Sequence, residues 1–452
     1  MKKILLLGLA LAALTLAACG DSNGDESTVT ITYANWNLGT VEENNINRRM
    51  IQAFMDEHPG IVVEVDETIT GDWMEALTMA AATNSLPDVF MINDVAPMVI
   101  NGWLMDITEI SRADAEFNRL PAAIREAVTL NDVVFSVPIA QHMIGFFANL
   151  TLFDALNLNP PSFGITPDEF FQAIRDTTDL NRPSIGISHL QTIAEWFPGA
   201  VNPNLGFFSF DGNNYNLNAP EMLEAVRIAT ELNSNGFTWL GLDDDQRNNF
   251  FGTTWDGQGF RDGNVAFLQD GTWAMESLSI DAAHFDWDFI SVPGQRPVLT
   301  IDILGIASTS QHPEEAYLFA KWMGHGDAGF TRRIELSEAA GSSVGTLPFT
   351  NNQTILDAFW ANMDTPGLRA AYAALGNALI DGNKFVPGHL QARFHAPTGI
   401  SIGDNDNASM GDAIWNAMLG NINFPDHAAN LNAIANQAHQ AELDQVNAAM
   451  GR

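Results

Sequence analysis

Polar and aromatic side chains follow three short apolar segments of this 452-residue chain, at the point where each segment ends. They are Asn35, Trp36 and Asn37 after the first segment, Asn93 and Asp94 after the second, and Gln141 and His142 after the third. Amide, carboxylate and imidazole groups supply paired hydrogen-bond donors and acceptors. An indole adds a flat apolar face with one N–H donor. Such a set can hold a ligand that carries many hydroxyl groups, and sugars have this chemistry.

The elements before these residues predict an α/β fold. Residues 29–34 and 61–65 have the composition and alternation of strands, and residues 86–91 read as a short buried strand. Between them, residues 46–55 and 73–83 repeat apolar side chains at helical spacing. This alternation predicts mainly parallel sheets with helices on both faces. In such sheets the loops after the strand C-termini form the binding crevice, which would bring the polar residues together.

Further elements are predicted along the rest of the chain. Residues 133–139 and 144–149 read as two strands, separated by residues 140–143. Thr166, Pro167 and Glu169 have the types expected at the N-cap, first and third positions of a helix. Other helices are predicted at residues 221–233, 313–323, 413–419 and 431–450.

Length and charge restrict the class of protein. A chain of 452 residues exceeds the size at which one hydrophobic core stops growing, so two lobes are expected. Lys and Arg number 20 against 55 Asp and Glu, a net charge of −35. Such a surface repels nucleic acid and anionic lipid headgroups, so neither is an expected partner. No cluster has the spacing of a metal site, and no cofactor is expected.

The N-terminus has the pattern of a bacterial lipoprotein signal. Lys2 and Lys3 precede an apolar stretch that is too short for a comfortable membrane span, and small residues then lead to Cys19, the one cysteine of the chain. We expect residues 1–18 to be a signal peptide and Cys19 to carry the lipid. Residues 19–28 are polar and small, as in a flexible tether. The mature protein would be held at the outer face of the cell membrane.

A series of motifs, in order, resembles a known family. They include Ile31-Thr32-Tyr33-Ala34-Asn35-Trp36, His58-Pro59-Gly60-Ile61-Val62-Val63, Leu86-Pro87-Asp88-Val89, Gly102-Trp103-Leu104-Met105-Asp106, Val134-Phe135-Ser136-Val137-Pro138, Phe260-Arg261-Asp262-Gly263-Asn264-Val265-Ala266-Phe267, Asp270-Gly271-Thr272-Trp273 and His312-Pro313-Glu314-Glu315-Ala316. The chain is similar, over about residues 1–325, to the extracellular solute-binding proteins of family 1, the sugar-binding subunits of ABC importers related to maltose-binding protein. Ala148 and Thr166 depart from the residues usual in that family, and the segment after residue 330 matches poorly.

The resemblance implies a two-lobed, hinged periplasmic-binding-protein fold of type II. Lobe 1 would comprise residues 29–140 and about 295–345, and lobe 2 residues 141–294 and about 346–452. A monomer would capture a sugar or oligosaccharide between the lobes and deliver it to the permease subunits, with no catalysis. The predicted ligand-binding residues are Trp36, Asn37, Asn93, Asp94, Gln141, His142, Trp196, Trp255, Asp270 and Trp273. Trp273 has the position of a stacking aromatic in the family, although any tryptophan here can equally serve the core.

Other ligands and one other class stay open. A polyamine or a short peptide could use an acidic, aromatic cleft, whereas phosphate and sulfate fit poorly because few basic residues lie near the candidate loops. A secreted glycosidase would use two carboxylates. In a chain this acidic, carboxylate pairs occur by chance, and neither a P-loop nor an HExxH motif occurs.

Overall fold

The computed structural model describes residues 28–361, 363 and 365–452. The predicted signal peptide and the lipidation site Cys19 therefore lie outside the described residues. No helix within the described part of the chain is both long and apolar enough to cross a membrane.

One mixed sheet of nine strands runs through the described part of the chain, in the order β2-β1-β3-β10-β6-β8-β7, with β11 on β10 and β9 on β6. The strands are β1 (Val29–Ala34), β2 (Ile61–Val65), β3 (Val89–Ile92), β4 (Thr129–Leu130), β5 (Val133–Val134), β6 (Ser136–Asn149), β7 (Ile185–Ile187), β8 (Val265–Gly271), β9 (Trp287–Phe289), β10 (Val298–Ile306) and β11 (Leu379–Ile380). β1 pairs in parallel with β2 and β3, and β7 with β8. The central strands β3, β10, β6 and β8 are antiparallel neighbours. β4 and β5 form a separate hairpin.

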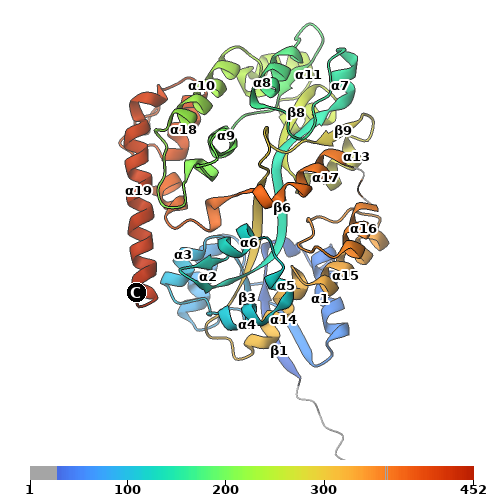
Figure 1. The fold of residues 1–452 in the computed structure, drawn as a ribbon, viewed down its shortest axis with the longest axis vertical. Coiled ribbons are helices and arrows are strands. Elements are labelled where there is room, and N and C mark those ends of the chain that lie inside the picture. The colour runs from blue at the N-terminus through green and yellow to red at the C-terminus, as the bar shows by residue number, and fades with distance from the viewer. Residues whose placement is uncertain (1–27, 362, 364) are drawn as a thin grey trace, which may run out of the picture.

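Helices cover the sheet (Figure 1). They are α1 (Ile46–Glu57), α2 (Trp73–Ala82), α3 (Val95–Ile100), α4 (Thr108–Ala113), α5 (Ala115–Asn118), α6 (Ala122–Ala127), α7 (Leu150–Ala155), α8 (Pro167–Asp176), α9 (Ile193–Val201), α10 (Pro220–Ser234), α11 (Asp244–Phe251), α12 (Asp256–Arg261), α13 (Met275–Asp281), α14 (Pro313–Met323), α15 (Asp327–Ala340), α16 (Gln353–Ala361), α17 (Pro366–Ala373), α18 (Met410–Met418) and α19 (Phe424–Ala449). The 3-10 turns η1 (Trp36–Leu38) and η4 (Thr272–Ala274) lie at the ends of β1 and β8.

Most helices and strands that local sequence patterns predicted are present in the structure. α14 has the predicted bounds, and α8 begins with the predicted capping box. The α/β class is confirmed, but parallel pairing is limited to β1 with β2 and β3, β7 with β8, and β11 with β10, while the central strands are antiparallel neighbours. The two strands predicted around residues 140–143 are one continuous strand, β6. Backbone pairing with β10 keeps this stretch extended, from Ser136 opposite Gly305 to Ile144 opposite Val298.

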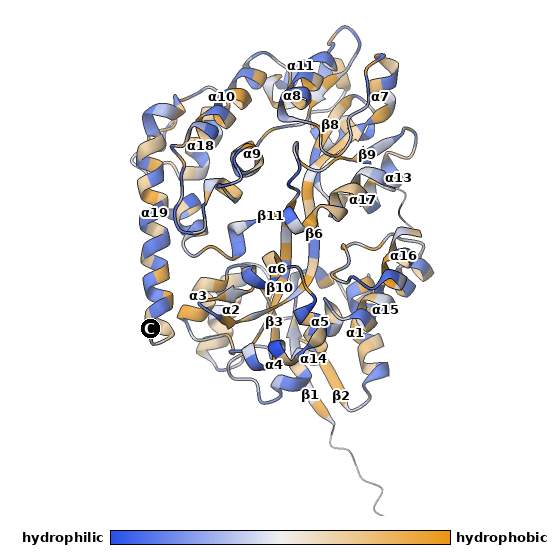
Figure 2. Cartoon of the chain, viewed as in Figure 1, coloured by the Kyte–Doolittle hydropathy of each residue, from blue (hydrophilic) through white to orange (hydrophobic). Residues whose placement is uncertain are grey.

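The buried apolar residues form three clusters. The first core includes Ile31, Phe54, Phe90, Val137 and Ile303. The second core, around Phe146, and the third, around Phe147, lie farther along the sheet. Side chains alternate across a strand, so these two neighbours send their rings to opposite faces of β6. Figure 2 shows the hydrophobic colours concentrated on the strands of the sheet.

Strands β6 and β10 and helix α19 connect the first core with the second, and β10 does so through Ile303 and Val298. β6 carries Val137 in the first core and Phe146 in the second. The long helix α19 places Leu431 in the second core and Val446 in the first. Figure 1 shows α19 running along the side of the molecule past both halves. The two halves of the protein are therefore joined by two shared strands and by a helix that packs on both.

Candidate functional site

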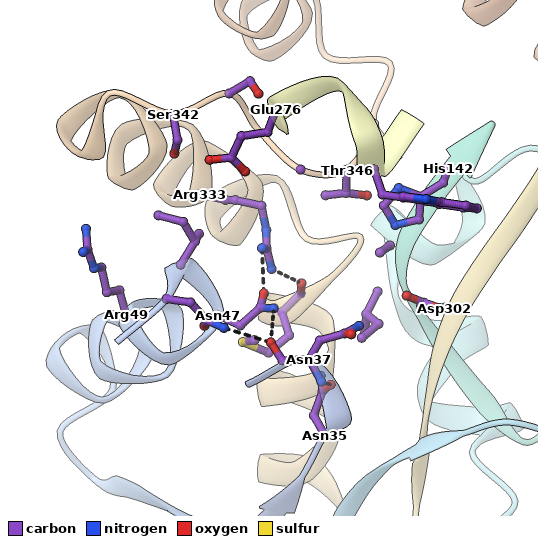
Figure 3. A pocket seen from close by; sticks show the side chains of 18 of the residues that line it. Asn35, Asn37, Asn47, Arg49, His142, Glu276, Asp302, Arg333, Ser342 and Thr346 are labelled. Atoms are coloured by element: carbon purple, nitrogen blue, oxygen red, sulfur yellow. Dashed lines mark hydrogen bonds between the residues drawn. The ribbon is translucent and has the colours of Figure 1, made fainter. Parts of the chain in front are cut away.

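A cavity of about 520 Å³ lies where elements of both halves meet. Its walls come from the end of β1, the start of α1, the central strands β6 and β10, the segment from α15 to residue 346, and η4 with α13. Polar and charged side chains that line it are Asn35, Asn37, Asn45, Asn47, Arg49, His142, Glu276, Asp302, Arg333, Ser342, Ser343 and Thr346, and the indole of Trp273 joins them. Figure 3 shows these side chains converging from several elements.

An asparagine cluster forms the wall below β1. Asn35 ends the strand, donates through Nδ2 to the Tyr33 hydroxyl at 2.6 Å and accepts from the Asn37 backbone N–H at 2.7 Å. These bonds turn the chain into η1. The Asn37 carbonyl then accepts from the side-chain amides of Asn45 and Asn47 at 3.0 and 3.2 Å. Asn45 also caps α1 by accepting from the Arg48 backbone N–H. The Asn37 side chain remains exposed at the cavity.

His142 and Trp273 form the opposite wall. Their rings meet edge to face, with centroids 5.5 Å apart and planes at 72°. Burial lowers the pKa of His142 to about 4, so the imidazole is neutral near pH 7. Its Nδ1 atom is buried and has no hydrogen-bond partner within the described residues. The Trp273 side chain, by contrast, is 48% exposed and offers a flat surface for stacking.

Gly271 makes room for the Trp273 ring. A Cβ atom at residue 271 would lie 2.4 Å from two carbons of the indole, closer than side chains allow. The ring therefore lies directly against the backbone at the end of β8. The glycine of the Asp-Gly-Thr-Trp motif is therefore needed so that the Trp273 ring can lie against the backbone.

Of the other predicted residues of this half, Asp270 lies beside Trp273 and Trp255 packs on Arg261. Asp270 directly precedes Gly271, and burial raises the pKa of its carboxyl group. His189 Nε2 lies 3.8 Å from an oxygen of Asp256, and Asp270 also acts on that imidazole. Trp255 is 57% exposed and stacks on Arg261, whose guanidinium carbon lies 5.1 Å from the ring centroid. Neither Trp255 nor Asp270 lines the cavity itself.

Trp36 lies in η1 between two residues of the cavity wall but does not itself line the cavity. Its ring is 40% exposed and packs edge to face on Trp73 at 5.0 Å, while Trp73 donates to the Met91 carbonyl at the end of β3. Among the described residues, Trp36, Trp255 and Trp273 are the tryptophans with large exposed surface. All three were predicted as ligand-binding residues.

Asn93 and Asp94 have a different environment. Asp94 is buried at the N-terminus of α3, where it accepts from the Ala96 backbone N–H. Burial, with the nearby carboxylate of Glu442 on α19, raises the pKa of Asp94 to about 8. The Asn93 Oδ1 atom is also buried and unpaired within the described residues. Neither residue lines the cavity.

The structure corrects two predicted ligand contacts. Trp196 is 1% exposed and packs against Phe146 and Phe197 in the second core, so it cannot touch a ligand in the cavity. Gln141 is 1% exposed, and its amide donates to the Pro348 carbonyl at 2.5 Å. Its backbone carbonyl accepts from the Leu347 N–H, which fixes the segment after α15 to β6. Gln141 therefore positions a wall of the cavity without lining it.

The sequence analysis missed the charged residues of the cavity. Arg333 comes from α15, and Arg49 from α1. Glu276 reaches the cavity from α13, and Asp302 from β10, where it pairs with Lys384 at 2.6 Å. Only the fold brings these distant segments together, so no local spacing could reveal them.

Two short motifs bear on the enzyme alternative. Residues 341–345 and 399–403 both match G-x-S-x-G, the pattern of a hydrolase nucleophile. Neither occupies the strand-to-helix turn that exposes such a serine, because residues 341–345 follow the end of α15 and residues 399–403 form an irregular loop. Within the described residues, no three or more His, Cys, Asp or Glu side chains gather as metal ligands.

Comparison with known proteins gives the class. Residues 49–338 match the family model of the bacterial extracellular solute-binding proteins, and the chain belongs to that family. Members of this family are binding proteins that act outside the cytoplasm. The chain is 25% identical, over 354 residues, to the multiple sugar-binding protein of Streptococcus mutans. This alignment covers 71% of the chain and 78% of the Streptococcus protein.

Solved structures share the fold. An ABC substrate-binding protein of Listeria monocytogenes, in complex with cycloalternan, superposes with a TM-score of 0.65 at 18% identity, over 94% of this chain and 99% of its own. The GacH receptor of Streptomyces glaucescens also superposes with a TM-score of 0.65, at 17% identity. The superposition covers 92% of this chain and 99% of the GacH chain. The periplasmic-binding-protein fold is thus confirmed.

Proposed function

We propose that this chain is the sugar-binding subunit of an ABC importer and captures a mono- or oligosaccharide in the cavity described above. The observation that carries the proposal is the cavity between the two halves, where exposed Trp273 stands opposite the asparagines of η1 and α1. Indole faces stack on the C–H faces of sugar rings, and amide side chains pair with hydroxyls. The Streptococcus mutans relative is named as a multiple sugar-binding protein, which supports the same ligand class.

The mode of action we propose is closure of two lobes around the sugar. Lobe 1 would comprise residues 29–140 and about 295–345, and lobe 2 residues 141–294 and about 346–452. The separation of the first core from the second supports this division. A ligand that touches both sides of the cavity stabilises the closed arrangement by its additional contacts there.

The experiment is a thermal-shift screen of the purified mature protein against sugars, polyamines and short peptides. A ligand that binds the folded state raises the melting temperature by mass action, so the responding compound names the ligand class. We expect a sugar to respond and small-angle scattering to show compaction with the same compound. A response to polyamines or peptides alone would contradict the proposal.

Two finer points belong to the same proposal. We expect lipid on Cys19 and tethering of the folded protein through residues 19–28, which a Cys19→Ala variant released into the medium would support. We also expect a bound oligosaccharide to be recovered unchanged after long incubation. Its hydrolysis would instead support the glycosidase alternative.

A further inference from the structure

The cavity is lined by arginine side chains, although the protein as a whole is strongly acidic. Lys and Arg make up 20 residues against 55 Asp and Glu, a net charge of −35. Yet two arginines, Arg49 and Arg333, line the same cavity. Within the described part of the chain, neither forms an ion pair with a carboxylate; of the other fourteen arginines nine do and five do not.

Arg333 is held by neutral partners. Its Nη1 donates to Asn47 Oδ1 at 2.9 Å and its Nη2 to the Met323 carbonyl at 3.0 Å. These bonds fix the guanidinium at the cavity wall, where Figure 3 shows it reaching from α15 toward Asn47. Burial lowers the pKa of Arg333 to about 10, so the group remains charged at neutral pH. A partly buried cation without a counter-charge is unfavourable until an anion reaches it.

Arg49 adds a second cation at the cavity. Its Nε donates to the Asn44 carbonyl at 2.9 Å, which leaves the terminal nitrogens of the guanidinium for another acceptor. Figure 3 shows Arg49 at the edge of the site, apart from Arg333, so it adds positive charge to the cavity from a separate position.

The two acidic side chains of the cavity do not cancel these cations. Asp302 is paired with Lys384, and the Lys384 ammonium also donates to the Ile301 carbonyl. Glu276, from α13, is exposed and is drawn near Arg333 in Figure 3, but within the described residues it forms no ion pair with either arginine. A cationic ligand would have to approach two unpaired guanidinium groups, which argues against a polyamine.

We propose that the ligand is an acidic sugar whose carboxylate binds at Arg333, with Arg49 adding positive charge to the same cavity, while its ring stacks on Trp273. This inference rests on the proposed function and specifies its ligand class. A guanidinium binds a planar carboxylate through two parallel hydrogen bonds, and this pairing is stronger in a partly desolvated site. Asn37 and Asn47 lie on the same wall as Arg333. Their side chains can accept hydrogen bonds from the hydroxyls of the same sugar ring or donate to them.

The test compares sugars that differ only in the acid group. Calorimetric titrations would use digalacturonate, the neutral digalactose with the same linkage, and a sulfated digalactose, together with the corresponding glucose series. We expect a carboxylated sugar to bind at least about tenfold more tightly than its neutral counterpart, with an affinity that falls as salt is added.

Variants assign the effect to the arginines. Arg333→Gln and Arg49→Gln should each weaken binding of the acidic sugar by about tenfold and bring it toward the neutral one. Arg112→Gln removes the same charge from an exposed site outside the cavity and should leave the affinity unchanged. Arg333 also joins α1 to α15, so melting temperature is measured for every variant. Arg49→Gln tests the charge without touching that link, and Glu276→Gln should strengthen binding of the acid.

The outcomes separate the two levels of the proposal. The acidic-sugar inference would be overturned if neutral sugars bind as tightly as acidic ones. It would also be overturned if both arginine variants still prefer the acidic sugar. Either result would leave the sugar-binding function intact. A preference for the sulfated over the carboxylated sugar would also overturn that inference. If no sugar of either kind binds, the proposed function falls with it.

Discussion

The indole of Trp273 meets the imidazole of His142 edge to face, with ring centroids 5.5 Å apart. Trp273 follows β8, whereas His142 lies in the middle of β6, and both line the cavity. The contact leaves one face of the indole directed at solvent while a neutral, buried imidazole holds its edge. An aromatic fixed in this way loses little entropy when a ligand stacks on it.

Replacement of Trp273 by Ala should therefore weaken sugar binding by about tenfold or more, because the stacking surface is lost. The ligand-induced change in tryptophan fluorescence should shrink with it. Trp360→Phe is the control, since Trp360 packs on Tyr372 and Arg369 outside the cavity. Equal affinity in the Trp273→Ala and wild-type proteins would exclude stacking at this position.

Asp94 makes stability depend on pH. Its pKa rises from the ordinary 3.8 to about 8 in the folded protein, through burial first and the Glu442 carboxylate second. The folded state thus holds this proton more tightly than the unfolded state, so the protein loses stability as the pH rises from about 4 toward 8. Tyr215 and Glu442 face the same group, and burial also raises the pKa of both.

An Asp94→Asn variant tests this dependence. The amide oxygen can still accept from the Ala96 N–H, but the side chain no longer ionises. We expect the variant to be more stable than wild type above about pH 8 and to differ little near pH 4. Melting temperatures across this range measure the effect, and parallel curves for the two proteins would show that Asp94 does not carry it.

The capping box of α8 contributes measurable stability. Thr166 Oγ1 accepts from the Glu169 N–H at 3.3 Å, and a Glu169 carboxylate oxygen accepts from the Thr166 N–H at 3.0 Å. Thr166→Ala should cost about 1 kcal/mol of the free energy of unfolding. Thr78→Ala, in the exposed middle of α2, is the matched control and should be neutral or slightly stabilising because Ala favours helices. Denaturant titrations compare the two variants.

Replacement of Trp196 should lower the stability of the folded protein without changing which sugars it prefers. Its side chain fills the second core between Phe146 and Phe197. Trp196→Ala would remove that volume and cost about 3–5 kcal/mol. At a temperature where the variant is folded, its order of preference among sugars should match that of wild type. A changed order would indicate that Trp196 acts on the site after all.

Local patterns predicted the elements well, and they failed where tertiary structure decides. Gln141 and His142 were both predicted to face a ligand because both follow an apolar run. They are neighbours in one strand, so their side chains point to opposite faces, and only His142 reaches the cavity. Trp196 lies in α9, which is buried on nearly every side, so its sequence context did not distinguish core from site.

The charge of the cavity was beyond sequence reasoning. Few basic residues are close in sequence to the candidate loops after residues 33, 91 and 139, so phosphate and sulfate were expected to fit poorly. Arg333 comes from a segment where the family resemblance is weak, and it meets Asn47 only because α15 packs beside α1. Non-local packing of this kind leaves no trace in spacing or periodicity.

The shared strand β6 also governs how the protein comes apart. Its residues stabilise the first core through Val137 and the second through Phe146, and α19 repeats this link with Val446 and Leu431. Unfolding of either core removes partners from the other, so the melting of one half destabilises the remaining half. Heating should accordingly produce one cooperative calorimetric transition in place of two, and proteases should find no long-lived half-molecule to release.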